Sequence, residues 1–271
     1  MTPRSPTRDR FGEVVRRDPV DVGLACLLIG CEVDPDLDVD AALAVLDALA
    51  ASARPQVPPG SSPEAAAEGL RRALGERAGF EGGSYDELRS SLLHEVLRRG
   101  RGLPLLLSVV WLEVAKRLEI PSYAVGLPGH VLVGIGNPAG THVLVDPFSG
   151  GRVVDREQLR GPDTRPVPAE LFAPLPATDL LLRLLNNVRA LAARQPRTLG
   201  TAATRLWAVQ LSLLLPRHPV QLRRERGELL VRLGDHLGGA QELETYALVV
   251  ADAEEKTYAR RAARLARAQL N

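Results

Sequence analysis

A histidine and an aspartate between residues 126 and 151 have the types and spacing of two members of a catalytic triad. The segment reads GLPGHVLVGIGNPAGTHVLVDPFSGG, in which His130 opens one apolar run and Asp146 closes the next. Both runs are typical of β-strands, and the Gly- and Pro-containing stretches beside them favour tight turns. Opposite Cβ atoms on antiparallel strands lie about 4.5–5.5 Å apart. This spacing allows the Asp146 carboxylate to orient a His130 base for nucleophilic catalysis.

The nucleophile of such a set is expected at the start of an apolar helix, which the sequence LLLSVVWLEVAKRL predicts over residues 105–118. The chain reads RGRGLPLLLSVVW there, without a cysteine. Pro104 is a good first residue for a helix but carries no nucleophilic atom. Ser108 is the nearest hydroxyl, one helical turn further on. Two interpretations stay open for it: a substitute nucleophile, or a small polar residue bonded to its own helix.

Structural roles compete with chemical ones for the other polar residues. His130 is either a satisfied histidine beside a turn or part of a ligand site. Asp146 is placed to cap the turn that follows it, whatever else it does. His142 alternates with core valines and is predicted to be an exposed strand residue. His94 and Glu95 lack the second histidine of a helical zinc motif, so we expect neither a metal nor a cofactor.

The charge of the chain is nearly balanced, with 34 Lys and Arg against 33 Asp and Glu and a formal net charge of +1. Such a balance provides no field that attracts nucleic acid or an anionic membrane. The chain contains neither a long apolar run nor the apolar core of a signal peptide. Cys26 and Cys31 are five residues apart, which turns them to different faces of a helix and disfavours a disulfide. We therefore expect a cytoplasmic protein that binds neither nucleic acid nor a membrane.

The sequence predicts an α+β fold that is mainly helical. Three short runs, PSYAVGL, HVLVGIG and THVLVDPF, have the pattern of an antiparallel meander and are the only convincing sheet. The Pro-rich residues 161–178 are predicted to be a linker. Five more helices are expected from Asp179 to the end. The helices predicted before the sheet cover residues 20–32, 39–52, 63–76, 84–99 and 105–118.

The C-terminal helices have the lengths of helix-hairpin repeats with a loose period. The stretch GELLVRLGDHLGGAQELETYAL has the spacing of a tetratricopeptide unit. Its markers are Gly227, Leu233, Gly234, Ala240 and Tyr246. One good unit and one degenerate unit are expected.

Four stretches together carry a resemblance to a known family. They are GFEGGSYDELRSSLLHEVLRRGRGLPLLLSVVWLEVAKRLEIPSYAVGLPGHVLVGI, VLVDPFSGG, LLRLLNNVRAL and RRERGELLVRLGD. With them the chain resembles, nearly end to end, the bacterial family that joins a transglutaminase-like domain to C-terminal tetratricopeptide repeats, the Sir B type. The resemblance implies a papain/transglutaminase-like core, a central helix on a small antiparallel sheet, in which His130 and Asp146 match the triad and Pro104 takes the place of the active cysteine. The domains expected are residues 1–60, a helical segment packed on the core; 61–175, the core; and 176–271, the repeats.

Three function classes follow from these residues. The first is a non-catalytic scaffold or regulator that binds a peptide or protein in a cleft lined by His130, Asp146, Glu113 and Trp111, with the repeats as a second partner surface. The alternative is a residual cysteine-protease-like or amidase hydrolase using Ser108, His130 and Asp146. The third is a structural protein in which the pair only secures the sheet. The sequence names neither a partner nor an oligomeric state.

Overall fold

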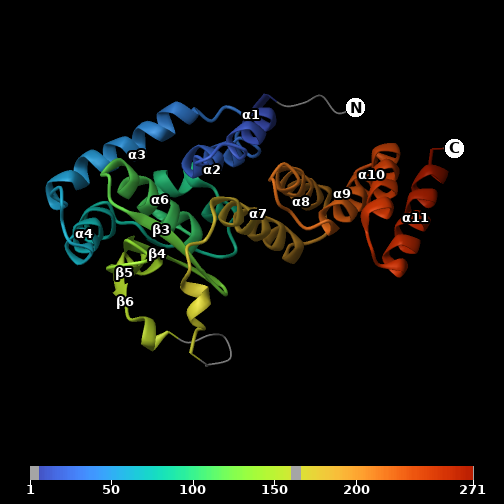
Figure 1. The fold of residues 1–271 in the computed structure, drawn as a ribbon. Helices are drawn as coiled ribbons and strands as arrows, with labels where there is room; N and C mark the ends of the chain where they lie inside the picture. Colours follow the sequence, from blue (N-terminus) through green and yellow to red (C-terminus); the bar gives the residue numbers. More distant parts are fainter. Residues whose placement is uncertain (1–5, 160–165, 271) are drawn as a thin grey trace. The chain divides into compact units, whose positions relative to one another are not determined.

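The structure, a computed structural model, describes residues 6–159 and 166–270 of the chain (Figure 1). Contacts divide it into two compact units. One unit is Asp21–Leu184, and the other combines the N-terminal segment to Val20 with the chain from Leu185 onward. These units divide the chain at places other than the predicted boundaries at residues 60 and 175, because the helices of residues 21–60 pack on the helix of residues 104–117.

The Asp21–Leu184 unit is built around a four-stranded antiparallel sheet in the order β3-β4-β5-β6. The three predicted strands are confirmed, and a fourth, β6, was not predicted from the sequence. A two-residue turn with Gly129 at φ 71° joins the first pair, as a Pro-Gly sequence favours. The strands are β3 (Ser122–Leu127), β4 (His130–Gly136), β5 (His142–Asp146) and β6 (Arg152–Val154).

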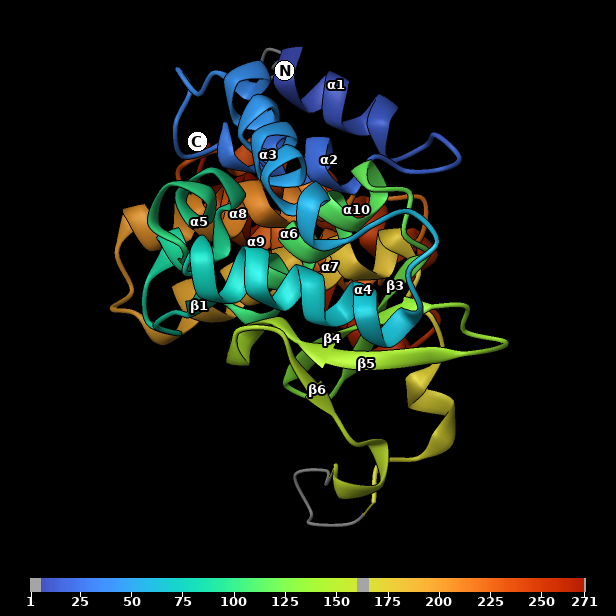
Figure 2. The same ribbon diagram turned by 90° about the vertical axis from the view of Figure 1, so that its left-hand side faces the viewer.

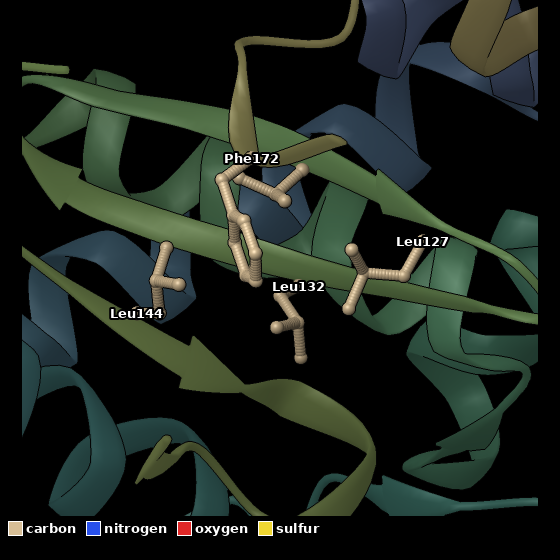
Figure 3. Packing of buried hydrophobic residues seen from close by; sticks show 5 residues of the cluster. Leu127, Leu132, Leu144 and Phe172 are labelled. Atoms are coloured by element: carbon tan, nitrogen blue, oxygen red, sulfur yellow. The ribbon is translucent and has the colours of Figure 1, made fainter. Parts of the chain in front are cut away.

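Apolar side chains pack on both faces of this sheet. A cluster of Val125, Leu127, Leu132, Leu144 and Phe172 covers one face (Figure 3). Strand side chains alternate in direction, so the residues between them, Val131, Val133 and Ile135, point to the other face. Helix α6 (Pro104–Arg117) packs against β3 and β4. The sheet is therefore the middle layer of this unit.

Helix α6 is the central helix that the sequence predicts, displaced by one residue. Proline at its first position needs no hydrogen-bond acceptor there, and nearly all of its residues are buried. Lys116 and Arg117 lie in its last turn, where they suit the helix dipole. The chain leaves the helix through Glu119, whose φ of 59° lies in the left-handed region that favours glycine.

Further helices surround α6, as Figure 2 shows. Asp21, Asp38 and Ser62 cap α2, α3 and α4, because their side chains accept hydrogen bonds from the first turns of these helices. The helix predicted to end at residue 76 changes to a π-helix after Leu70. The elements are α2 (Val22–Gly30), α3 (Val39–Ala53), the 3₁₀-helix η1 (Arg54–Gln56), α4 (Pro63–Leu70), the π-helix η2 (Arg71–Arg77) and α5 (Leu93–Arg99).

The helix predicted over residues 84–99 is wrong in its first half. A 3₁₀-helix, η3 (Leu88–Ser91), precedes α5, and Leu92 between them is extended. The Ser90 carbonyl accepts a hydrogen bond from Leu103 N–H at 2.9 Å, which ties η3 to the segment before α6. A second sheet that was not predicted, the parallel pair β1 (Glu81–Gly82) and β2 (Arg101–Gly102), lies in the same region.

The predicted linker is partly structured. Residues 161–165 of it lie outside the described chain. Beyond them the 3₁₀-helix η6 (Ala169–Phe172) places Phe172 on the sheet, and Leu175 N–H donates to the Ala124 carbonyl at 2.8 Å. This stretch therefore covers the free edge of β3. Two more 3₁₀-helices flank β6, η4 (Pro147–Ser149) and η5 (Arg156–Gln158).

The second unit is helical, as the sequence predicts. Helices α9 and α10 pack closely because Gly227 and Gly239 face each other; a Cβ on Gly239 would lie 2.8 Å from the Gly227 carbonyl oxygen. Helix α10 also packs on α11. The described helices are α1 (Pro6–Val14), α7 (Ala177–Arg194), which crosses the boundary between the units, α8 (Leu199–Ser212), α9 (Gln221–Arg232), α10 (His236–Val249) and α11 (Ala253–Ala268). None of the helices described is long and apolar enough to span a bilayer.

Candidate functional site

His130 and Asp146 are in direct contact in the structure. The β4–β5 register pairs Val133 with Val145, so Asp146 lies across from Leu132 and diagonally from His130. Diagonal neighbours are within reach of long side chains. His130 Nε2 lies 3.0 Å from Asp146 Oδ1, and the side chains are 27% and 15% exposed. The strands thus hold the imidazole beside the carboxylate, with both side chains partly exposed.

Asp146 also organises the turn that follows it. Its Oδ1 accepts a hydrogen bond from Phe148 N–H at 3.0 Å, and its Oδ2 accepts one from the Ser149 hydroxyl at 2.8 Å. Burial raises the pKa of Asp146, but the hydrogen bond and charge of His130, with those two donors, outweigh burial and leave the pKa below its usual value. The carboxylate therefore carries a negative charge at neutral pH and serves both the turn and His130.

The charge on Asp146 determines which nitrogen of His130 is available. An ionised carboxylate only accepts hydrogen bonds, so Nε2 donates to it. In the neutral imidazole the other nitrogen, Nδ1, then carries a lone pair. Nδ1 makes no hydrogen bond within the described part of the chain. The site thus offers one oriented hydrogen-bond acceptor, Nδ1 of His130. This nitrogen can act as a base or can bind an N–H or O–H group of a ligand.

Two aromatic rings that sequence reasoning missed extend the site. Phe148 meets the His130 ring edge-on, with centroids 6.1 Å apart, and Tyr85 contacts Phe148 at 6.0 Å. A Cβ on Gly82 would lie 2.6 Å from the Phe148 ring, so only glycine allows the ring this position. Burial and the charge of Asp146 raise the pKa of Tyr85. Phe148 follows Asp146 in the sequence and could have been found, whereas Tyr85 lies in a turn without a signal.

The start of α6 carries no reactive atom. Pro104 is buried at its first position. Ser108, one turn on, is fully buried, and its hydroxyl donates to the Val131 carbonyl at 3.1 Å. This bond runs to β4 and not to the serine's own helix, which corrects that interpretation. The hydroxyl is thus engaged by main chain next to His130 and not by His130 itself.

Glu113 and Trp111, expected to line the cleft, make structural contacts elsewhere in the unit. Glu113 is 4% exposed; its Oε1 accepts from Gly23 N–H at 3.0 Å and its Oε2 pairs with Arg117 at 2.6 Å. Trp111 is fully buried and packs edge-on against Phe80. Its indole also lies under Gly151, in the loop after Asp146. The expectation that these two side chains bind a ligand with His130 is not supported, because both are enclosed.

The other polar candidates lie apart from this pair. His142 is half-buried on β5, with Nδ1 3.0 Å from the Gly140 carbonyl oxygen, so it is less exposed than expected. Cys26 and Cys31 form no disulfide in the part of the chain that the structure describes, and burial raises the pKa of Cys26. Within residues 6–159 and 166–270, no three His, Cys, Asp or Glu side chains are arranged to hold a metal ion.

Asparagine at position 146 is expected to reduce stability in a pH-dependent way. A carboxylate with a lowered pKa stabilises the folded state above about pH 3.9, its unfolded value, and this stabilisation is lost as the pH falls through the folded value. Hydrogen bonds to a charged group are worth about 1.5–3 kcal/mol, so Asp146→Asn should lower the free energy of unfolding by that order at pH 6. Urea unfolding of both proteins between pH 6 and pH 3 measures this. A difference that stays constant across the range would show that the charge of Asp146 has no such role.

Comparison with known proteins agrees with this fold. A family model of the transglutaminase-like superfamily matches residues 40–186, which contain the central helix, the sheet and both polar residues. The chain belongs to the transglutaminase-like superfamily.

Its relatives include proteins similar over most of their length. The chain is 33% identical to a UPF0162 protein of Xylella fastidiosa strain Temecula1, over 81% of this chain and 80% of that protein. It is 32% identical to UPF0162 protein PA3419 of Pseudomonas aeruginosa, over 72% of this chain and 73% of the relative. A weaker similarity, 25% identity over 47% of this chain, links it to 22% of F-box only protein 21 of Mus musculus. No solved structure matches it.

Proposed function

We propose that the protein is a non-catalytic member of its superfamily that binds a peptide or protein segment at the His130–Asp146 pair. One observation carries this proposal: the pair is intact, with Nε2 and Oδ1 3.0 Å apart, while the helix start that would supply a nucleophile has Pro104. An accessible imidazole acceptor beside two aromatic rings can bind a main-chain N–H and an apolar side chain. With Pro104 at the helix start, no cysteine thiol stands there to form an acyl intermediate.

The C-terminal helices are proposed to add a second surface for a protein partner. Helix α10 packs on both α9 and α11, which supports the proposal that they form tetratricopeptide-like hairpins, and such hairpins accept helices or extended peptides. The nearly neutral charge of the chain favours a protein over nucleic acid or a membrane as partner, and we place this action in the cytoplasm.

Peptide selection with two histidine variants tests the first proposal. Peptides are first enriched on the purified protein from a random library. We expect them to bind at least about tenfold more weakly to His130→Ala, because the variant loses about one hydrogen bond between neutral groups and the contact with the imidazole ring. His142→Ala, a histidine on the next strand, should bind within about twofold of the parent protein. Fluorescence anisotropy measures both.

Two results would decide against peptide binding at this pair. One is that no peptide is enriched, and the other is that enriched peptides bind His130→Ala unchanged. If His130→Ala lowers the melting temperature and leaves every interaction intact, the pair has only the structural role of securing the sheet.

The alternative, a residual hydrolase with Ser108 as nucleophile, makes a distinct prediction. A serine-directed fluorophosphonate should label the protein, and Ser108→Ala should abolish the label. Because the hydroxyl is buried and already donates to Val131, we expect no labelling. Ser108→Ala is instead expected to cost about 1 kcal/mol of stability for the lost hydrogen bond. Mass spectrometry after probe treatment checks the first point and thermal unfolding the second. Labelling at Ser108 would establish the hydrolase.

A further inference from the structure

A hollow of about 540 Å³ lies in the Asp21–Leu184 unit, between the turn after α2 and the segment from η3 to α5. Its volume is within the range of small-molecule sites, about 300–1,000 Å³. The pair of the candidate site, His130 and Asp146, is not among the residues that line it. It is therefore a separate feature that the proposed function does not use.

Apolar side chains form much of the wall of this hollow. Leu92, between η3 and α5, is buried, and Leu88 is half-buried. Val33, on the turn after α2, is 45% exposed although it is a large apolar residue. A wall of this kind favours contact with an aliphatic group, because covering Val33 removes apolar surface from water.

The charged residues at the hollow leave one carboxylate unmatched. Glu87 pairs with Arg89 at 2.9 Å and with Arg99 at 3.0 Å, and Glu95 pairs with Arg98 at 2.7 Å. These guanidinium groups are thereby occupied. Among the described residues Asp34 has no ion pair, and its charge acts on the neighbouring His94. The three carboxylates and three guanidinium groups balance in number, but each guanidinium group is held by Glu87 or Glu95, whereas Asp34 is left to meet a ligand, so an organic cation is favoured over an anion beside it.

His94 adds a polar group that does not repel a cation. Its Nδ1 is buried against Gly30, where an added Cβ would lie 2.5 Å away, and has no hydrogen-bond partner. A proton on that nitrogen would have no acceptor. Burial lowers the pKa of His94 against the opposing effects of Glu95 and Asp34, so the ring is neutral at pH 7. Nε2 is not among the enclosed atoms and stays available for a hydrogen bond.

We propose that this hollow binds an alkylammonium group, with the aliphatic chain on Val33, Leu88 and Leu92 and the ammonium group beside Asp34 and His94. The group can belong to a free amine or to a lysine side chain of another protein. Both sources share the chemistry that the hollow recognises.

Three probes of equal chain length test the assignment. Hexylammonium, hexanoate and 1-hexanol are each titrated into the isotope-labelled protein at pH 7, and NMR shift changes give the dissociation constants. We expect hexylammonium to shift the signals of Val33 and His94 and to bind at least about threefold more tightly than the other two, the contribution of one partly exposed charge pair. The fourth probe is Nα-acetyl-lysine amide, which carries the lysine side chain without charged termini. If it binds as tightly as hexylammonium, the alkylammonium group comes from a lysine side chain; if it binds more weakly, the group comes from a free amine.

Two matched variants of the same turn distinguish binding at the hollow from non-specific binding of hexylammonium to acidic residues. Asp34→Asn should lower hexylammonium binding to the level of hexanol, while Asp36→Asn, an exposed acid of the same turn that does not line the hollow, should stay within about twofold of the parent protein. The proposal is overturned if the three probes bind equally, if Asp34→Asn has no effect, or if the shifts occur away from the hollow. None of these outcomes depends on His130, so the proposed function stands or fails separately.

Discussion

Cysteine in place of Pro104 is expected to become a reactive thiol under the control of His130. Helix α6 packs on β4, and the bond from the Ser108 hydroxyl to Val131 fixes that packing. Position 104 lies one turn before Ser108 on the same face, and His130 directly precedes Val131. A thiol at the first position of a helix is also favoured as thiolate by the helix dipole. The substitution therefore restores the type of residue that a transglutaminase-like triad lacks in this chain.

The size of the effect follows from the balance of two terms. If the thiol pKa falls from about 8.5 to about 6.5, the thiolate fraction at pH 6.5 rises about fiftyfold. The lower basicity reduces its nucleophilicity by about six- to tenfold, so the net gain is about five- to eightfold. We expect 2,2′-dithiodipyridine to react with Pro104→Cys faster by this factor than with Pro104→Cys/His130→Ala at pH 6.5.

The two native cysteines require a defined background for this measurement. Cys26 is buried and its raised pKa makes it unreactive, whereas Cys31 is partly exposed and is replaced by serine in all variants. Mass spectrometry confirms modification at residue 104. Equal rates with and without His130 would mean that the imidazole does not reach the helix start. Circular dichroism verifies that each variant is folded.

Alanine at position 113 is expected to cause the largest loss of stability. Glu113 lies within the unit and joins three elements: it accepts from Gly23 at the start of α2, pairs with Arg117 in its own helix, and Arg117 pairs with Asp47 of α3 at 2.6 Å. Removing one partner of a buried ion pair typically costs about 3–5 kcal/mol. Arg117 keeps Asp47 after the substitution, so we expect about 3 kcal/mol, measured by urea unfolding at pH 7.

Glutamine at the same position separates charge from hydrogen bonding. Glu113→Gln keeps an oxygen that can accept from Gly23 N–H and loses the ion pair, so it should cost about 1–2 kcal/mol, clearly less than alanine. Neither variant should alter peptide binding at His130. If both variants kept the stability of the parent protein but lost peptide binding, Glu113 would instead bind the ligand with His130, as the sequence suggested.

The sequence predicts the parts of this fold that have a strong local period. The apolar run of α6 and the alternating strands around Pro128 and Asn137 are such parts, and the structure confirms them. The predictions fail where contacts with another segment override the local pattern. Residues 84–92 have a helical pattern, but they do not form one continuous helix. The Ser90 carbonyl accepts a hydrogen bond from Leu103 N–H and Leu92 is extended, and the sequence of residues 84–92 alone predicts neither feature. Strand β6 has three residues, too few for a period.

For the candidate site, sequence reasoning could pair His130 with Asp146 because register and turn length connect the two strands. It could not place Glu113 or Trp111, because a helix that is apolar on nearly all sides does not tell which face meets the sheet and which meets α2. Tyr85 reaches the site through the fold of η3 and β1, far from the motif in sequence. Close contacts that require glycine, such as that of Gly82 with Phe148, likewise depend on the tertiary structure and cannot be predicted from the sequence.

The two duties of Asp146 restrict how this site can change by mutation. The same carboxylate holds the main chain of Phe148 and the hydroxyl of Ser149 in place, so its loss disturbs the loop that covers Trp111 as well as the imidazole. His130 has no comparable second task in the described chain. A lineage that abandons catalysis can therefore discard the histidine at small cost but not the aspartate. The aspartate alone is thus a poor marker of activity among relatives.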